Sequence, residues 1–155
     1  YLDKLGVKES ERDEVYEGIM TPCAWLTDKE VTAVMEEVGR ENIFILSQGE
    51  EAFQRDKIDR AVGDKVLGSH VAIVSESKTE ELMKICETYK DEDVIFADDK
   101  LKFLNTLPAS DLPNLKTVLF NERGLQTLRA EIAESRRMEG GEVVQEQSGG
   151  GPKMR

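Results

Sequence analysis

Short apolar segments that alternate with longer amphipathic segments are the feature that most constrains this chain. Four runs, at residues 42–47, 71–74, 94–97 and 116–120, are expected to be strands, and the first three have the continuous apolar pattern of strands buried on both faces of a parallel sheet. Parallel strands need crossover connections, and the segments between the runs have the apolar spacing of helices. The strict order of strand and helix therefore predicts an α/β fold, a three-layer sandwich with a parallel sheet and right-handed crossovers.

Helices are expected at residues 50–62, 79–89 and 122–138, each after one of these apolar runs. Before the first run, Thr27 and Glu30 have the spacing of a capping box and predict a helix over residues 28–39.

The chain ends differ from this middle part. Residues 1–21 are charged, with scattered apolar positions, and predict one or two short helices that end at Thr21-Pro22. From Gly140 onward the sequence is rich in glycine and polar residues, which predicts a flexible tail.

Composition excludes several classes of function. The net charge is −11, which argues against nucleic acid and anionic lipid as partners, because both are bound by basic surfaces. No apolar run approaches the roughly 18 residues that span a bilayer. The two cysteines, Cys23 and Cys86, are expected to be free thiols in a reducing cytoplasm, and the single His70 is expected to be structural.

Polar side chains suited to phosphate chemistry follow three of the four predicted strands. In chain order they are Ser47, Gln48 and Gly49, then Lys78, then Asp98 and Asp99. Ligands of open α/β sheets bind beyond the carboxyl ends of the strands. A hydroxyl and backbone N–H groups can hold phosphate oxygens, an ammonium can neutralise their charge, and paired carboxylates suit Mg²⁺.

Each of these residues also has a plain structural explanation. Ser47 can serve only as a turn or capping residue, Lys78 as a solvated lysine, and Asp98-Asp99 as the cap of the next helix. Their order, and their common position at strand ends, favours one shared functional site over three unrelated structural roles.

This arrangement resembles the haloacid dehalogenase (HAD) superfamily of phosphatases and related hydrolases. Residues 43–49 look like its second motif, an apolar strand that ends in Ser or Thr. Lys78 falls where the third-motif lysine belongs, and residues 94–99 look like the fourth motif, an apolar strand that ends in paired acids. The resemblance covers residues 27–121 and implies a Rossmann-like (HAD-like) sheet.

The resemblance also implies an activity, that of a Mg²⁺-dependent phosphatase acting on a small phosphate ester. Ser47, in a substrate-binding loop with Gln48 and Gly49, would hydrogen-bond the phosphoryl group, and Lys78 would stabilise its charge. The metal would be bound by Asp99, with its neighbour Asp98 orienting ligands or water. By the same resemblance, residues 1–22 are similar to the end of a helical cap, residues 23–139 to the α/β core, and residues 140–155 to a tail.

One motif of the family is missing. Its first motif is an apolar strand followed by Asp-x-Asp, whose first Asp is the nucleophile, and the only Asp-x-Asp here, at residues 91–93, precedes its strand. In the family the missing strand is the middle of the sheet, between the strands that carry Ser47 and Asp99. We therefore expect one of three situations: this is the C-terminal part of a longer protein, a second chain supplies the strand, or the sheet closes differently without HAD-type activity.

Two other classes compete with a phosphatase. A two-component receiver domain uses paired acids, a hydroxyl and a lysine, but its acid pair comes first and its lysine last, unlike the order here. A catalytically inactive HAD-like fold, acting as a binding or regulatory module, would keep the sheet without the nucleophile.

Overall fold

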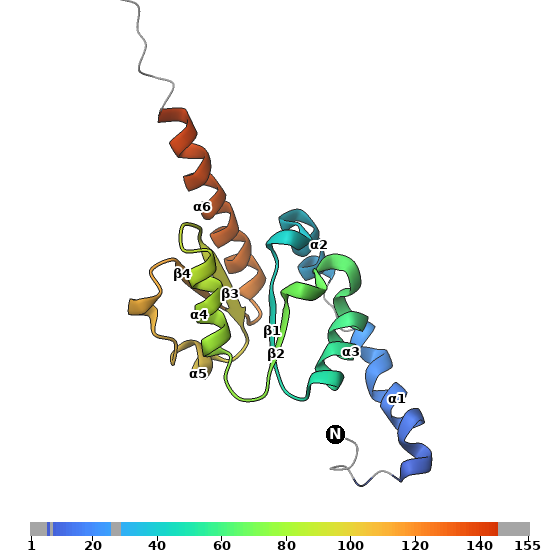
Figure 1. Ribbon diagram of the computed structural model, residues 1–155. Coiled ribbons are helices and arrows are strands. Elements are labelled where there is room, and N and C mark those ends of the chain that lie inside the picture. Colours follow the sequence, from blue (N-terminus) through green and yellow to red (C-terminus); the bar gives the residue numbers. More distant parts are fainter. Residues whose placement is uncertain (1–5, 7, 26–28, 146–155) are drawn as a thin grey trace, which may run out of the picture. The chain divides into compact units, whose positions relative to one another are not determined.

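Two compact units, Tyr1–Lys84 and Ile85–Arg155, make up the chain (Figure 1). The computed structural model describes residues 6, 8–25 and 29–145, with side chains for residues 6, 8–20 and 29–139. Its strands form two parallel sheets of two strands each. The α/β class and the parallel pairing are thus confirmed, and within the described residues hydrogen bonds join the strands in two pairs.

The first unit contains the sheet of β1 (Ile45–Gln48) and β2 (Val71–Val74) with the helices α1 (Arg12–Trp25), α2 (Lys29–Val38) and α3 (Glu51–Val62). The predicted bounds of β2 are confirmed, and those of α2 and α3 agree to within one residue. The predicted N-cap Thr27 lies outside the described residues.

An apolar core joins α2 and α3 to one face of this sheet. Its buried centre is Ile58, Val66 and Val71, and the half-buried side chains packed against it are Met35, Ile43, Ile45, Val62 and Ile73. Ser47 pairs with Ile73 and lies two residues beyond Ile45, so it shares the face that α3 covers. The strand thereby directs the Ser47 side chain toward α3.

The second unit contains the sheet of β3 (Val94–Asp98) and β4 (Leu115–Leu119), with α5 (Leu101–Leu104) between the strands and α6 (Gly124–Gln145) after them. The helix α4 (Thr79–Thr88) leads into this unit from the first. The side-chain amide of Asn114 donates to the carbonyls of Cys86, Tyr89 and Glu92 at 2.9–3.1 Å, and so fixes the end of α4 beside the start of β3.

Two predictions about element ends were wrong. The helix α1 continues over Pro22 to Trp25, although proline cannot donate a hydrogen bond to the carbonyl four residues earlier. The helix α6 runs to Gln145, past Met138 and through the glycines that were predicted to begin the tail. The segment after β3 contains α5 and a 3-10 turn at Ala109–Asp111.

The structure shows the surroundings of Cys86 and His70, for which the sequence predicts a free thiol and a structural role. Cys86 is buried and free of any disulfide, and burial raises the pKa of its thiol, whereas the Cys23 side chain lies outside the described part. His70 stacks on Phe44 with ring centroids 4.0 Å apart, and its Nδ1 lies 3.1 Å from the Ile43 carbonyl oxygen. These contacts agree with the structural role predicted for His70.

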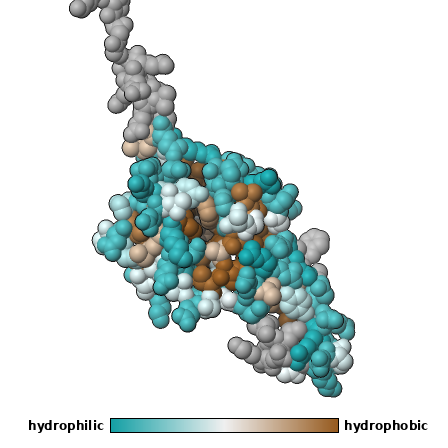
Figure 2. Space-filling model, in the orientation of Figure 1, coloured by the Kyte–Doolittle hydropathy of each residue, from teal (hydrophilic) through white to brown (hydrophobic). Residues whose placement is uncertain are grey.

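Hydrophilic residues cover most of the face that Figure 2 shows, with a smaller apolar area among them. The most exposed large apolar side chain among the described residues is Met138, at 65%.

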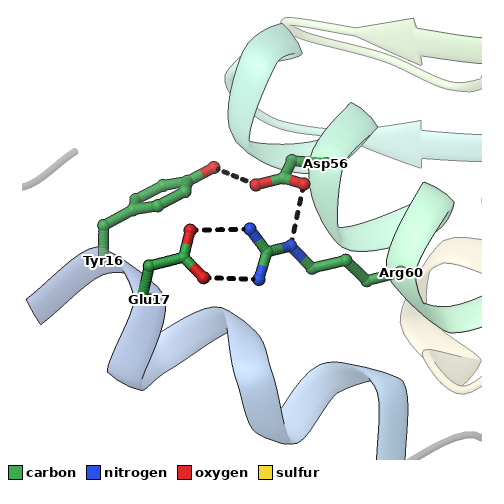
Figure 3. Close-up of polar contacts among 4 residues, drawn as sticks. All are labelled: Tyr16, Glu17, Asp56 and Arg60. Atoms are coloured by element: carbon green, nitrogen blue, oxygen red, sulfur yellow. Dashed lines mark hydrogen bonds and ion pairs between the residues drawn. The ribbon is translucent and has the colours of Figure 1, made fainter. Parts of the chain in front are cut away.

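A polar cluster fixes α1 against α3 (Figure 3). Arg60 donates to both carboxylate oxygens of Glu17 at 2.9 and 3.0 Å and to Asp56 at 2.8 Å, while the Tyr16 hydroxyl donates to Asp56 at 2.9 Å. Tyr16 also meets Phe53 edge to face, and Met20 beside it on α1 is fully buried. The cluster therefore adds a directional polar contact to an apolar one.

The cluster changes the acidity of its members. The hydrogen bonds from Arg60 lower the pKa of Glu17, and those from Arg60 and Tyr16 lower the pKa of Asp56. Burial and the contact with Asp56 raise the pKa of Tyr16. A carboxyl group with a lowered pKa stabilises the folded state above its unfolded pKa, and this contribution is lost as the pH falls through the folded pKa.

We expect Glu17→Gln to loosen α1, because it removes the charge that Arg60 binds. Amide hydrogens of α1 should exchange with solvent about two- to fivefold faster than in the wild type at pH 7, since exposed ion pairs contribute modestly. Wild-type protein should show the same loosening when the pH is lowered below about 4. Glu14→Gln, an exposed change on the same helix, is the control. Equal acceleration in both variants would contradict the role given to the ion pair.

Candidate functional site

The end of β1 is held by bonds to the end of β2. The Gly49 N–H donates to the Val74 carbonyl at 2.9 Å, and the Gln48 side-chain amide donates to the carbonyl of Glu76. The segment Ser47-Gln48-Gly49 is therefore a fixed edge of the sheet, as the sequence predicts for a strand end.

The Ser47 hydroxyl points at α3 and donates to Oε1 of Gln54 at 3.0 Å. Gly49 allows this contact, because a Cβ there would lie 2.9 Å from Nε2 of Gln54. Gly49 also has φ +149°, a region that residues with a side chain rarely adopt. The sequence analysis did not identify Gln54. The only hint in the sequence is that Gln54 is a polar residue in the first turn of the helix that follows Ser47.

The start of α3 is capped by its own carboxylate. The Glu50 side chain accepts from the N–H groups of Ala52 and Phe53 at 3.1 and 2.8 Å, and these bonds lower its pKa. An anion could use these two donors only by displacing Glu50. A phosphate bound at this edge therefore depends chiefly on side-chain donors.

Lys78 immediately precedes α4 and is half-buried. Its carbonyl accepts the Leu82 N–H at 3.0 Å, and the hydroxyl of Ser77 accepts the Thr79 N–H at 3.2 Å. Because β1 and β2 are parallel, Ser47 and Lys78 both belong to the carboxyl edge of the same sheet. Ser47 thus lies on β1 near this edge, and Lys78 follows the end of β2 by four residues.

The acid pair follows β3 in the second unit, and its two members differ. Asp98 is buried, and its Oδ1 accepts the Lys100 N–H at 2.8 Å, as expected for the member of the pair that caps a turn. Its carbonyl accepts the Phe120 N–H at 2.9 Å, whereas the Asp99 side chain is exposed. Asp98 and Asp99 therefore lie at the carboxyl edge of the second sheet.

Carboxylate oxygens are suitable ligands for magnesium, but two of them make only part of a site. Mg²⁺ is commonly bound by one or two carboxylates together with water and substrate phosphate. Among the side chains that the structure describes, no group of three or more His, Cys, Asp or Glu residues is placed to hold a metal. Asp98 and Asp99 have the chemistry of a partial site that needs further oxygen ligands.

Comparison with known protein families, curated proteins and solved structures found no match to this chain. Across the described ranges, none of the helices combines the length and apolar character that a membrane crossing requires.

We expect Gly49→Ala to destabilise the edge that carries Ser47. The added Cβ meets the Gln54 amide, and its φ is unfavourable for alanine, so the free energy of unfolding should fall by about 1–3 kcal/mol. Gly68→Ala is the matched control, because Gly68 has open space around its Cβ position and no positive φ. Urea denaturation of both variants measures the difference, and equal midpoints would contradict the strain assigned to Gly49.

Proposed function

We propose that this chain is the core of a HAD-like hydrolase that cleaves a small phosphate ester through an aspartyl-phosphate. The observation that supports it most is the carboxyl edge of the β1–β2 sheet, where a strand-ending serine and a helix-starting lysine occur together. A hydroxyl and an ammonium at one edge match the needs of a phosphoryl group, which has only acceptor oxygens and carries negative charge.

The proposed roles follow from the chemistry of each group. The Ser47 hydroxyl donates to a phosphoryl oxygen, and the Lys78 ammonium stabilises the charge of the transferring group and of the nucleophile. Asp99, assisted by Asp98, binds Mg²⁺, which when bound offsets the negative charge of the phosphate. Gln48 and Gly49 complete the loop that faces the substrate.

The nucleophile in this proposal is an aspartate on an apolar strand that is not among the 155 residues. Sheets of two strands leave backbone N–H and C=O groups at their edges that need partners. An added strand, from another segment of the same protein or from a second chain, would pair with β1, with β3 or with both. Two-stranded sheets are marginal by themselves, which supports this part of the proposal.

We also propose a cytoplasmic protein with no nucleic-acid partner. The buried free thiol of Cys86 suits a reducing compartment, and the net charge of −11 disfavours binding to phosphate backbones.

The second candidate is a catalytically inactive HAD-like module that binds or regulates. Two observations favour it: the sequence has no Asp-x-Asp at a strand end, and the Glu50 carboxylate occupies N–H donors at the start of α3. Such a module would still bind phosphate through Ser47 and Lys78, but would not turn it over.

Hydrolysis of p-nitrophenyl phosphate with Mg²⁺ separates the two candidates. We expect no turnover by the 155-residue chain alone, and turnover once an apolar strand ending in Asp-x-Asp is joined ahead of it. In the active form, Lys78→Met and Asp99→Asn should each lower kcat/KM by about 100-fold or more, because each removes charge stabilisation. Gln126→Met, an exposed amide change in α6, is the control and should leave turnover unchanged.

Three results would count against the hydrolase. Turnover by the 155 residues alone would show that the nucleophile is already present. Activity unaffected by Asp99→Asn would remove the metal assignment. Absence of turnover in the extended chain, with phosphate still bound, would favour the binding module.

A further inference from the structure

The hydroxyl hydrogen of Ser47 has two possible acceptors, the Gln54 side chain and a bound phosphoryl group. A serine hydroxyl has one hydrogen, and in this structure it is donated to Oε1 of Gln54 at 3.0 Å. A phosphoryl oxygen can only accept, so Ser47 has to give it the same hydrogen. The hydroxyl cannot serve both acceptors at once, and binding must change its partnership with Gln54.

The surroundings of Gln54 hold its backbone in place. Its N–H donates to the Glu50 carbonyl at 3.0 Å in the first turn of α3, the turn that the Glu50 side chain also caps. Its amide passes over Gly49, where the missing side chain leaves room for it. The helix start and Gly49 thus fix where the amide lies. Rotation about χ3, the last torsion of the Gln54 side chain, meets only a low barrier.

A half-turn of that torsion exchanges the amide oxygen and nitrogen. The amide would then present Nε2 to Ser47 and donate to its oxygen instead of accepting from it. The serine hydrogen would be released for the phosphoryl oxygen, whose charge makes it a stronger acceptor than a neutral amide.

We infer that Gln54 is the positioning residue for the Ser47 hydroxyl, accepting its hydrogen in the empty site and donating to its oxygen when a phosphoryl group is bound. The inference rests on the proposed function, since it concerns phosphate held by Ser47. It adds Gln54 to the site residues predicted at the strand ends. It also assigns a second role to Gly49, which leaves the space in which the Gln54 amide rotates.

Two isosteric variants separate this role from simple packing. Gln54→Glu can accept from Ser47 but, when ionised, cannot donate, so it should keep the hydroxyl engaged and weaken binding of inorganic phosphate by about tenfold or more. Gln54→Met neither accepts nor donates, leaves the hydrogen free, and should weaken binding by only about threefold. A purely structural contact predicts the reverse order, because glutamate preserves the bond seen here.

The added charge of glutamate needs its own control. Ala52→Glu places the same charge on an exposed position of the same helix turn and should weaken phosphate binding less than Gln54→Glu does. Titration of the wild type and the three variants with inorganic phosphate in the presence of Mg²⁺, followed by NMR of the Ser47 backbone amide, measures binding in all four proteins. In the wild type the Gln54 NH₂ signals should shift as phosphate binds.

The outcomes distinguish the two proposals. If the wild type binds phosphate and Gln54→Glu binds as well as Ala52→Glu, the role of Gln54 is overturned and the proposed function stands. If the wild type binds no phosphate, both fail together. Loss of binding in Gln54→Glu, beyond that in Ala52→Glu, with binding largely kept in Gln54→Met, supports the inference.

Discussion

Pairing of parallel strands is the constraint on which the rest of this structure depends. A parallel pair cannot be closed by a tight turn, so each pair here is joined by a crossover that contains a helix, α3 between β1 and β2 and α5 between β3 and β4. Both strands of a pair then end at the same edge. That is why Ser47 and Lys78, which are far apart in sequence, belong to one edge of one sheet.

The helix α3 carries three separate tasks because its side chains repeat with helical spacing. Ile58 faces the sheet and its apolar core, and Asp56 and Arg60, four residues apart, hold α1. Gln54, at the first turn, reaches the strand end that the helix follows. Attachment of α1 and orientation of the Ser47 hydroxyl therefore depend on the same short helix, and a change in its position would affect both.

The sequence predicts the α/β class, the parallel pairing and the bounds of several elements, because buried apolar residues recur with the spacing of the strand or helix that carries them. The apolar run at β2 gives its bounds correctly, and the glycine after α2 marks the helix end, where φ is +88°. Local rules failed where packing outweighs them. The fully buried Met20 and the polar cluster anchor α1, so the proline at position 22 does not end it. Gln54 could not be predicted as a partner of Ser47, because their contact depends on the path of the backbone through Gly49.

The acidic composition takes on a specific meaning at the edge of the first sheet. Glu50 already serves as the internal anion of α3, and the net charge of −11 opposes any phosphate that approaches. An anionic substrate can be held there only if positive charge is concentrated at the same edge. Lys78 supplies one positive charge. A bound divalent cation would add further positive charge, which the neutral Ser47 hydroxyl cannot provide. A chain this acidic can therefore support phosphate chemistry only if its lysine and a metal ion act together. The positive charge of these two groups matters more to the proposed reaction than the shape of the sheet edge.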